Sequence, residues 1–279
     1  MEGFWGLLFG TLGLRPYVFI FLAAYLLIAT WHLGLGRALI YLIVGYVLAW
    51  LSEFSSIHTG LPYGRYIYIE ATRGQELWVL GVPFMDSLSY VFLSYASYTV
   101  ALLALAPIRD RHSGFYRLET EIRQCSRGTL ILASVLFVTL DVIIDPVSLR
   151  GYRWFLGQIY GYPEPGIYFG VPLSNFLGWL VVGLVMIAVL QQISRLPDWS
   201  RGLSWGKRNF ARQELLGPVL YFAVLAFNLV ITFYIGETLL GLVGSFIYIP
   251  LLTLLIIGLL QRCHMAAGLQ GPDPGKEGA

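Results

Sequence analysis

Seven long apolar runs alternate along the chain with shorter segments rich in Gly, Pro, Tyr and charged residues. An α-helix needs about 20 mostly apolar residues to cross the hydrocarbon core of a bilayer, and these runs approach that length. The pattern predicts an all-α integral membrane protein with about seven transmembrane helices in one domain, residues 1–265. The spans are expected at residues 16–33, 37–54, 84–106, 129–146, 173–194, 216–235 and 240–261.

Composition supports the same class of protein. Hydrophobic residues make up 57% of the chain and charged residues 12%, about half the charged share of a soluble domain. No basic, aromatic-interleaved stretch indicates nucleic-acid binding, and no N-terminal signal peptide that would be removed is expected. Cys125 and Cys263 lack metal-type spacing and are interpreted as small apolar residues. The Gly-, Pro- and charge-rich tail, residues 266–279, is expected to be disordered.

The distribution of positive charge predicts an orientation. With seven spans, one side of the membrane receives the loop at Arg37, the loops at residues 107–128 and 195–215, and the C-terminal tail. That side carries 13 of the 18 Lys and Arg residues, and the other side carries 5. Because positively charged loops stay in the cytoplasm, we expect a cell-membrane protein with its N-terminus outside and its C-terminus inside. Six spans would break this asymmetry.

Two segments of the chain resemble each other. Residues 81–86 and 170–175 both read G-V-P-x-x-[D/N], and each follows a Gly- and Tyr-rich stretch. An acidic residue lies further upstream, Glu53 being 28 residues before the first Gly and Asp141 being 29 residues before the second. Both copies run the same way through the membrane, which is typical of a parallel internal repeat.

Each G-V-P unit predicts the start of a helix, because proline is favoured in the first helical turn, where its missing N–H costs nothing. Asp86 and Asn175 follow three residues after the respective proline. These two side chains are expected either to cap the helix or to line a site beside its exposed backbone N–H groups.

Acidic residues gather toward one face of the predicted bilayer. A charge at the centre of a transmembrane helix costs roughly 2.5–3.5 kcal/mol on insertion scales, so each one is a functional hypothesis. By the predicted topology, five acidic residues belong to the outer half of the membrane or its rim. They are Glu53, Asp86, Asp141, Asp145 and Glu237.

Asp141 and Asp145 are the best candidates for acid–base chemistry. They lie four residues apart and share a helix face, so their charges repel and favour a proton on at least one of them. A carboxyl group that stays protonated near neutral pH can act as an acid. Alternatively, the pair forms a structural ion cluster with Arg150, Arg153 or Arg65. Glu237 is interpreted as a solvated turn residue.

Two long loops, residues 55–83 and 147–172, are rich in aromatic residues. An aromatic belt explains rings near helix ends, but loops of over about 20 residues are uncommon unless they are functional. Aromatic faces also stabilise cations. We therefore expect these loops and the second repeat unit to supply substrate-binding residues, namely His58, Tyr63, Tyr66, Trp78, Trp154, Tyr168 and Asn175.

The sequence predicts no metal and no cofactor. His58 can relay protons near neutral pH, although an ordinary loop histidine explains it equally well. His32, His112 and His264 fall in other segments, so no metal site is predicted. P-loop, zinc-protease and dinucleotide motifs are absent from the sequence, as is a plausible pair of haem-binding histidines. Any chemistry is therefore expected to be cofactor-free.

Four motifs together carry a resemblance to a known family. They are H-T-G-L-P-Y-G-R-Y-x-Y at 58–68, G-V-P-F at 81–84, D-x-x-x-D-P at 141–146 and Y-F-G-V-P-L-S-N-F-x-G-W at 168–179. In combination they look like the membrane carotenoid 1,2-hydratase family, which includes bisanhydrobacterioruberin and γ-carotene hydratases. The resemblance covers roughly residues 40–190, with compatible hydropathy to about residue 260.

The resemblance implies addition of water across the C1–C2 double bond of an acyclic carotenoid end group, giving a tertiary alcohol. Such a reaction needs an acid for the alkene, a site that tolerates a tertiary cation and a base for the water. On chemical grounds, a protonated member of the Asp141/Asp145 pair is the predicted acid, and Glu53 or Asp86 orients the water. The roles of acid and base are interchangeable at this point. The expected partners are a carotenoid in the bilayer, water and lipid.

Three other readings fit parts of the sequence. A carotenoid cyclase or isomerase also needs an acid and a cation site, but it would exclude water. A proton-coupled transporter would explain a parallel repeat and intramembrane acids, although no clearly discontinuous helix interrupts a span. A structural membrane subunit would not explain why acidic residues cluster toward one face of the predicted bilayer.

Overall fold

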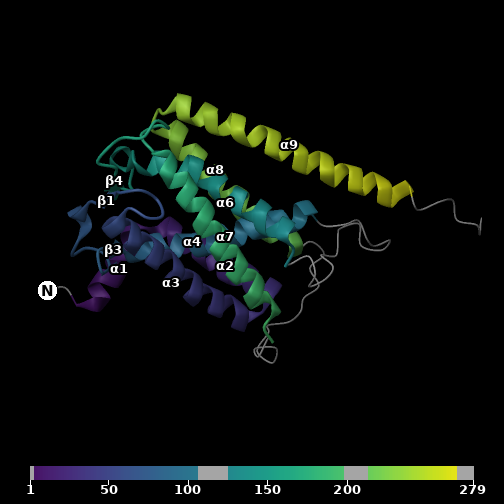
Figure 1. The fold of residues 1–279 in the computed structure, drawn as a ribbon, viewed down its shortest axis with the longest axis horizontal. Helices are drawn as coiled ribbons and strands as arrows, with labels where there is room; N and C mark the ends of the chain where they lie inside the picture. Colours follow the sequence, from purple (N-terminus) through teal and green to yellow (C-terminus); the bar gives the residue numbers. More distant parts are fainter. Residues whose placement is uncertain (1–2, 106–124, 198–212, 269–279) are drawn as a thin grey trace, which may run out of the picture.

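The computed structural model describes residues 3–105, 125–197 and 213–268, and these form a bundle of α-helices (Figure 1). Seven of the helices are long and apolar enough to cross a membrane, which confirms the predicted fold class. Within the described residues the helices are α1 (Phe4–Leu14), α2 (Pro16–Leu33), α3 (Leu35–Thr59), α4 (Phe84–Leu105), α6 (Arg127–Ser148), α7 (Leu173–Arg195), α8 (Gln213–Tyr234) and α9 (Thr238–Gly268).

The helix bounds follow the predicted spans closely, with three differences. The helix α3 continues to Thr59, five residues beyond the predicted end, so Glu53 lies inside the helix and not at its terminus. The short helix α1 was not predicted. The helix α9 runs to Gly268 and includes the first three residues of the predicted tail. The rest of that tail, and most of the positively charged loops at 107–128 and 195–215, lie outside the described residues.

The helix α4 is the centre of the bundle. Every residue from Tyr90 to Leu103 is buried, whereas the other spans each keep an exposed face. The helices α2, α3, α6, α7 and α8 all contact α4. Because lipid is as apolar as the core, such helices associate through close packing more than through a hydrophobic driving force.

Glycine allows this close packing at two helix contacts. A Cβ atom on Gly217 of α8 would lie 2.6 Å from the Thr99 Cβ atom of α4. A Cβ atom on Gly183 of α7 would lie 2.9 Å from the Phe137 ring of α6. Small residues at these positions let the helix backbones approach, as is common in membrane bundles.

The two long loops meet at one end of the bundle, beside α1 (Figure 1). They contain four two-residue strands, β1 (Ile67–Tyr68), β2 (Trp78–Val79), β3 (Val82–Pro83) and β4 (Tyr160–Gly161). The antiparallel pair β1–β4 joins one loop to the other, with Tyr68 opposite Tyr160. We call this end of the bundle the loop end.

The two copies of the sequence repeat share one backbone geometry. Leu80 and Gly81 have φ angles of 50° and 87°, and Phe169 and Gly170 have φ angles of 50° and 93°. Two successive positive φ values are typical of a tight type I′ hairpin turn, which favours glycine at these positions. In each copy the valine after the glycine pairs back across the turn. The G-V-P motif is therefore a hairpin that leads into a helix.

Proline lies just ahead of each helix and not within its first turn. Pro83 belongs to β3, and Pro172 is the N-cap residue of α7, with φ of −75° and ψ of 148°. Its fixed φ angle suits this extended position. The expectation of a helix start is thus confirmed, with the proline one residue earlier than predicted.

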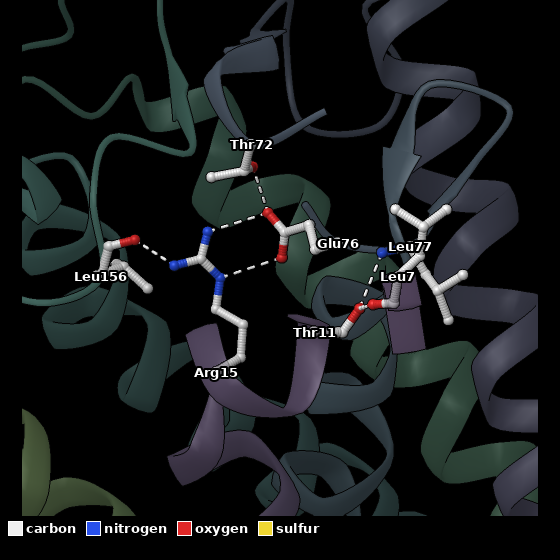
Figure 2. A network of polar contacts seen from close by, with 7 residues as sticks. All are labelled: Leu7, Thr11, Arg15, Thr72, Glu76, Leu77 and Leu156. Atoms are coloured by element: carbon white, nitrogen blue, oxygen red, sulfur yellow. Dashed lines mark hydrogen bonds and ion pairs between the residues drawn. The ribbon is translucent and has the colours of Figure 1, made fainter. Parts of the chain in front are cut away.

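A buried ion pair ties the N-terminus to both loops (Figure 2). Arg15 lies between α1 and α2, and its Nη2 atom is 3.1 Å from Oε1 of Glu76. Its Nε atom donates to Glu76 Oε2 at 3.3 Å, and its Nη1 atom donates to the carbonyl of Leu156. Thr72 also donates to Glu76. A single guanidinium group therefore connects the first helices with the 55–83 loop and the 147–172 loop.

Breaking this pair on one side should destabilise the loop end. The variant Glu76→Leu leaves the Arg15 guanidinium buried without its carboxylate, and such losses cost about 3–5 kcal/mol. We expect a clear drop in the thermal unfolding temperature of the detergent-solubilised protein. The double variant Arg15→Met/Glu76→Leu should recover much of that drop, because no buried charge remains.

The exposed pair Glu70–Arg73 provides the matched control. Both side chains are more than half exposed, so Glu70→Gln should leave the unfolding temperature nearly unchanged. An equal drop for Glu70→Gln and Glu76→Leu would contradict the special role of the buried pair.

Candidate active site

A cavity of about 110 Å³ lies between the helices at the loop end. Its wall is formed by α2, α3, α4, α6, α7 and α8 together with both long loops. All four of the predicted catalytic carboxyl groups line it. Of the predicted substrate-binding residues, the lining includes Tyr63, Tyr66, Trp154 and Asn175.

Asp141 and Asp145 on α6 form the first carboxyl group cluster. Both are nearly inaccessible to solvent, at 1% and 5% exposure. The side-chain amide of Asn175 donates to Asp141 Oδ2 at 2.8 Å and to Asp145 Oδ2 at 2.9 Å. Tyr162 donates to Asp145 Oδ2 at 2.8 Å, and Tyr160 donates to Asp145 Oδ1. Asp145 therefore accepts three hydrogen bonds and Asp141 accepts one.

Glu53 on α3 is the centre of the second carboxyl group cluster. It is buried, with 3% exposure. Ser87 of α4 donates to its Oε2 atom at 2.5 Å, and Tyr68 donates to its Oε1 atom at 3.2 Å. Asp86, one residue before Ser87, also lines the cavity. The repeat thus brings an acidic residue from a helix of each copy to the same cavity.

Hydroxyl and amide groups, and not cations, satisfy these carboxyl groups. Within the described residues Arg150 and Arg153 pair with Glu237, Arg150 Nε lying 3.1 Å from Glu237 Oε2. No ion pair to Asp141 or Asp145 occurs in the described part of the chain. The proposed arginine cluster around these two aspartates is therefore wrong, and Glu237 is an ion-paired residue, not a merely solvated one.

The remainder of the cavity wall is aromatic and aliphatic. Tyr90 stacks on Trp179 with ring centroids 4.5 Å apart, and Tyr63 and Phe137 contact the same indole. Tyr17, Val18 and Phe21 of α2, Phe92 and Leu93 of α4 and Val224 of α8 extend this apolar lining. One cavity thus joins a polar, acidic wall to an apolar one.

Three predicted substrate-binding residues lie away from the cavity lining. His58 is exposed in the last turn of α3, where its Nδ1 atom is 2.7 Å from the Phe54 carbonyl. Trp78 belongs to β2 and contacts Tyr68 edge to face. Tyr168 belongs to the second hairpin and contacts Phe169 and Phe176. The structure does not bring these three side chains to the carboxyl groups.

Several residues of the site were not predicted from the sequence, and most of them are hydrogen-bond donors. Tyr68, Tyr160 and Tyr162 bind the carboxyl groups directly, and Ser87 binds Glu53. Their signal in the sequence is the Y-x-Y pattern, which occurs at 66–68 and again at 160–162. Asn228 of α8 also lines the cavity, and its amide donates to the Val224 carbonyl at 2.9 Å.

Burial keeps the loop phenols protonated. It raises the pKa of Tyr66, Tyr68 and Tyr162 above the usual value for tyrosine, because the charged phenolate is poorly solvated there. The carboxyl groups nearby add to this effect.

In the described part of the chain, no group of three or more His, Cys, Asp and Glu side chains could hold a metal ion.

Comparison with known proteins places this site in a family. A family model described as "Carotenoid biosynthesis protein" matches residues 14–252. The bisanhydrobacterioruberin hydratase of Haloarcula japonica is 31% identical over 138 residues, which are 48% of this chain and 38% of that protein. The match thus spans well under half of the relative. No solved structure matches the chain.

Both findings agree with the resemblance carried by the four sequence motifs. The family match covers most of the chain, including α2 to α8 and every residue that lines the cavity. This protein belongs to the carotenoid biosynthesis protein family.

Proposed function

We propose that this protein is a hydratase that adds water across the C1–C2 double bond of an acyclic carotenoid end group, producing a tertiary alcohol. The observation that carries the proposal is the two-sided cavity. Carboxyl groups and aromatic and aliphatic side chains line the same cavity inside the bundle. A polyene that resides in the bilayer and reacts at one end needs an apolar binding surface and an acid in the same cavity. The hydratase name of the Haloarcula japonica relative supports the same reaction class.

Asp145 is the proposed acid. Protonation of an unactivated alkene requires a strong acid, so the carboxylate that forms as the proton leaves must be stabilised. Tyr160, Tyr162 and Asn175 are already placed as three donors to that carboxylate. Preorganised donors of this kind stabilise a charge that develops in the transition state. Asp141, four residues away, favours retention of a proton on the pair before reaction.

The proton goes to C2, and the positive charge appears at the tertiary carbon C1. The electron-rich rings of Tyr90 and Trp179 in the cavity wall stabilise that cation. A water molecule then attacks C1 through its oxygen. Glu53, assisted by Asp86, takes one proton from this water, so that the hydroxyl group stays on C1. The reaction consumes one water molecule and needs no cofactor.

The proposed setting is the cell membrane, with the loop end facing outward and the C-terminus in the cytoplasm. The proposed partners are the carotenoid, water and surrounding lipid. The loop end carries few Lys and Arg residues, in agreement with the positive-inside rule.

Replacing the acid should abolish product formation in a host that accumulates lycopene. With the wild-type chain we expect a carotenoid heavier by one water molecule for each hydrated end, detected by mass spectrometry. Asp145→Asn should lower the hydrated fraction at least about 100-fold, because general acid catalysis contributes that much or more. Asp141→Asn should lower it by a smaller factor.

Glu70→Gln is the control for these variants, since Glu70 is an exposed carboxylate outside the cavity. Its product yield should equal that of the wild type at matched protein level. Full hydration by both aspartate variants would overturn the assignment. A cyclic or isomerised product without added water would instead favour a cyclase or isomerase, and an unchanged polyene would favour transport.

The orientation is testable with single cysteines in a Cys125→Ser/Cys263→Ser background. His58 and Arg195 are both exposed and terminate spans at opposite ends of the bundle. A membrane-impermeant maleimide should label His58→Cys in intact spheroplasts and label Arg195→Cys only after lysis. The reverse pattern would place the loop end in the cytoplasm.

A further inference from the structure

Hydration by two separate carboxyl groups leaves a problem that the proposed mechanism does not solve. After each turnover the acid Asp145 has lost a proton, and the base Glu53 has gained one. The reaction itself neither releases nor consumes protons, so one proton must return from Glu53 to Asp145 before the next substrate reacts. Both groups are buried, with 3% and 5% exposure, which limits direct exchange with bulk water.

Four tyrosines lie between these two groups. Tyr66 and Tyr68 come from one loop, and Tyr160 and Tyr162 come from the other; we call them the tyrosine quartet. The β1–β4 pairing sets Tyr68 opposite Tyr160, and alternate residues of a strand point to the same face. All four side chains line the cavity. The Tyr66 ring centroid is 5.9 Å from that of Tyr160 and 6.3 Å from that of Tyr162.

The hydroxyl groups of the quartet end on the two carboxyl groups. On one side, Tyr66 donates to the Tyr68 hydroxyl at 3.4 Å, and Tyr68 donates to Glu53 at 3.2 Å. On the other side, Tyr160 and Tyr162 each donate to Asp145. The two halves adjoin the same cavity, which is large enough to hold the several water molecules that could join them.

We propose that the tyrosine quartet returns the proton from Glu53 to Asp145 after each turnover, with one cavity water between Tyr66 and Tyr160. Glu53 gives its proton to the Tyr68 oxygen while Tyr68 passes its own proton to Tyr66. Tyr66 passes a proton to the water, the water passes one to Tyr160, and Tyr160 passes its proton to Asp145. Every phenol and the water end with the same number of hydrogens as before, and one proton has moved.

The environment of the phenols suits this role. Their raised pKa values keep Tyr66 and Tyr68 protonated, so they pass protons on and do not hold a lasting charge. Figure 1 shows β1 and β4 side by side at the loop end, where this path lies. The inference rests on the proposed hydratase function, and it adds a role to residues that do not touch the reacting double bond.

The test uses Tyr66→Phe, which keeps the ring and removes one hydroxyl group. The full-length protein is reconstituted in liposomes that contain lycopene, and product is measured by rapid quench. The first turnover should stay within about twofold of the wild type, because Asp145 starts protonated. The steady-state rate should fall at least about tenfold, since proton return is now limiting. A burst of about one product per protein should appear, and added imidazole should raise the slow rate.

Two further variants make the result decisive. Tyr68→Phe should also lower the steady-state rate at least about tenfold, because it interrupts the same path at Glu53. Tyr41→Phe removes a buried hydroxyl that contacts Ser94 away from the cavity, and it should leave both rates unchanged. A steady-state rate for Tyr66→Phe and Tyr68→Phe equal to that of the wild type would overturn the relay alone. A fall of equal size in the first-turnover rate and the steady-state rate of Tyr66→Phe would also overturn the relay. A wild-type protein that makes no hydrated product would overturn the hydratase function, and the relay with it.

Discussion

Carboxyl groups inside an apolar bundle constrain the whole loop end of this protein. A buried carboxyl group is costly unless donors surround it. In the described part of the chain, Glu53, Asp141 and Asp145 meet hydroxyl and amide donors and no ion-pairing arginine. Several donors belong to the long loops, so the loops must be held accurately against the helices. The buried Arg15–Glu76 pair does this, because its guanidinium group also binds the second loop at Leu156.

The two copies of the internal repeat share similar backbone elements but place different polar side chains at the cavity. Each copy provides an acidic residue on a helix, a Tyr-x-Tyr segment and a hairpin that leads into the next helix. The copies then diverge at the site, since Asp86 of the first copy corresponds in sequence to Asn175 of the second. Asn175 bridges two aspartates, whereas Ser87 and Tyr68 bind a single glutamate. Divergence of this kind produces two carboxyl group clusters of different character, as the proposed acid and base catalysis requires.

The position of the cavity within the bundle suits the proposed carotenoid substrate. The cavity lies among helices that are long and apolar enough to cross a membrane, next to the polar loops of the loop end, so the proposed polyene and water would approach it from different directions. The apolar residues of α2 and α8 and the aromatic wall around Trp179 give the cavity its second side. Membership of the carotenoid biosynthesis protein family fits an interior of this kind.

The sequence by itself determined the membrane class, seven spans within a few residues and the candidate carboxyl groups. These properties depend on local hydrophobicity and on the cost of charge in lipid, which can be read without contacts. It also revealed the G-V-P repeat. The tertiary structure decided which neighbours complete the site. His58 and Trp78 share the 55–83 loop with Tyr63 and Tyr66, and Tyr168 shares the 147–172 loop with Trp154, yet all three lie outside the cavity lining. Tyr160 and Tyr162 bind Asp145 from a loop whose strand β4 pairs with β1. Strand pairing between segments more than 90 residues apart depends on how the two loops fold over the helices, and no local pattern of residues records that.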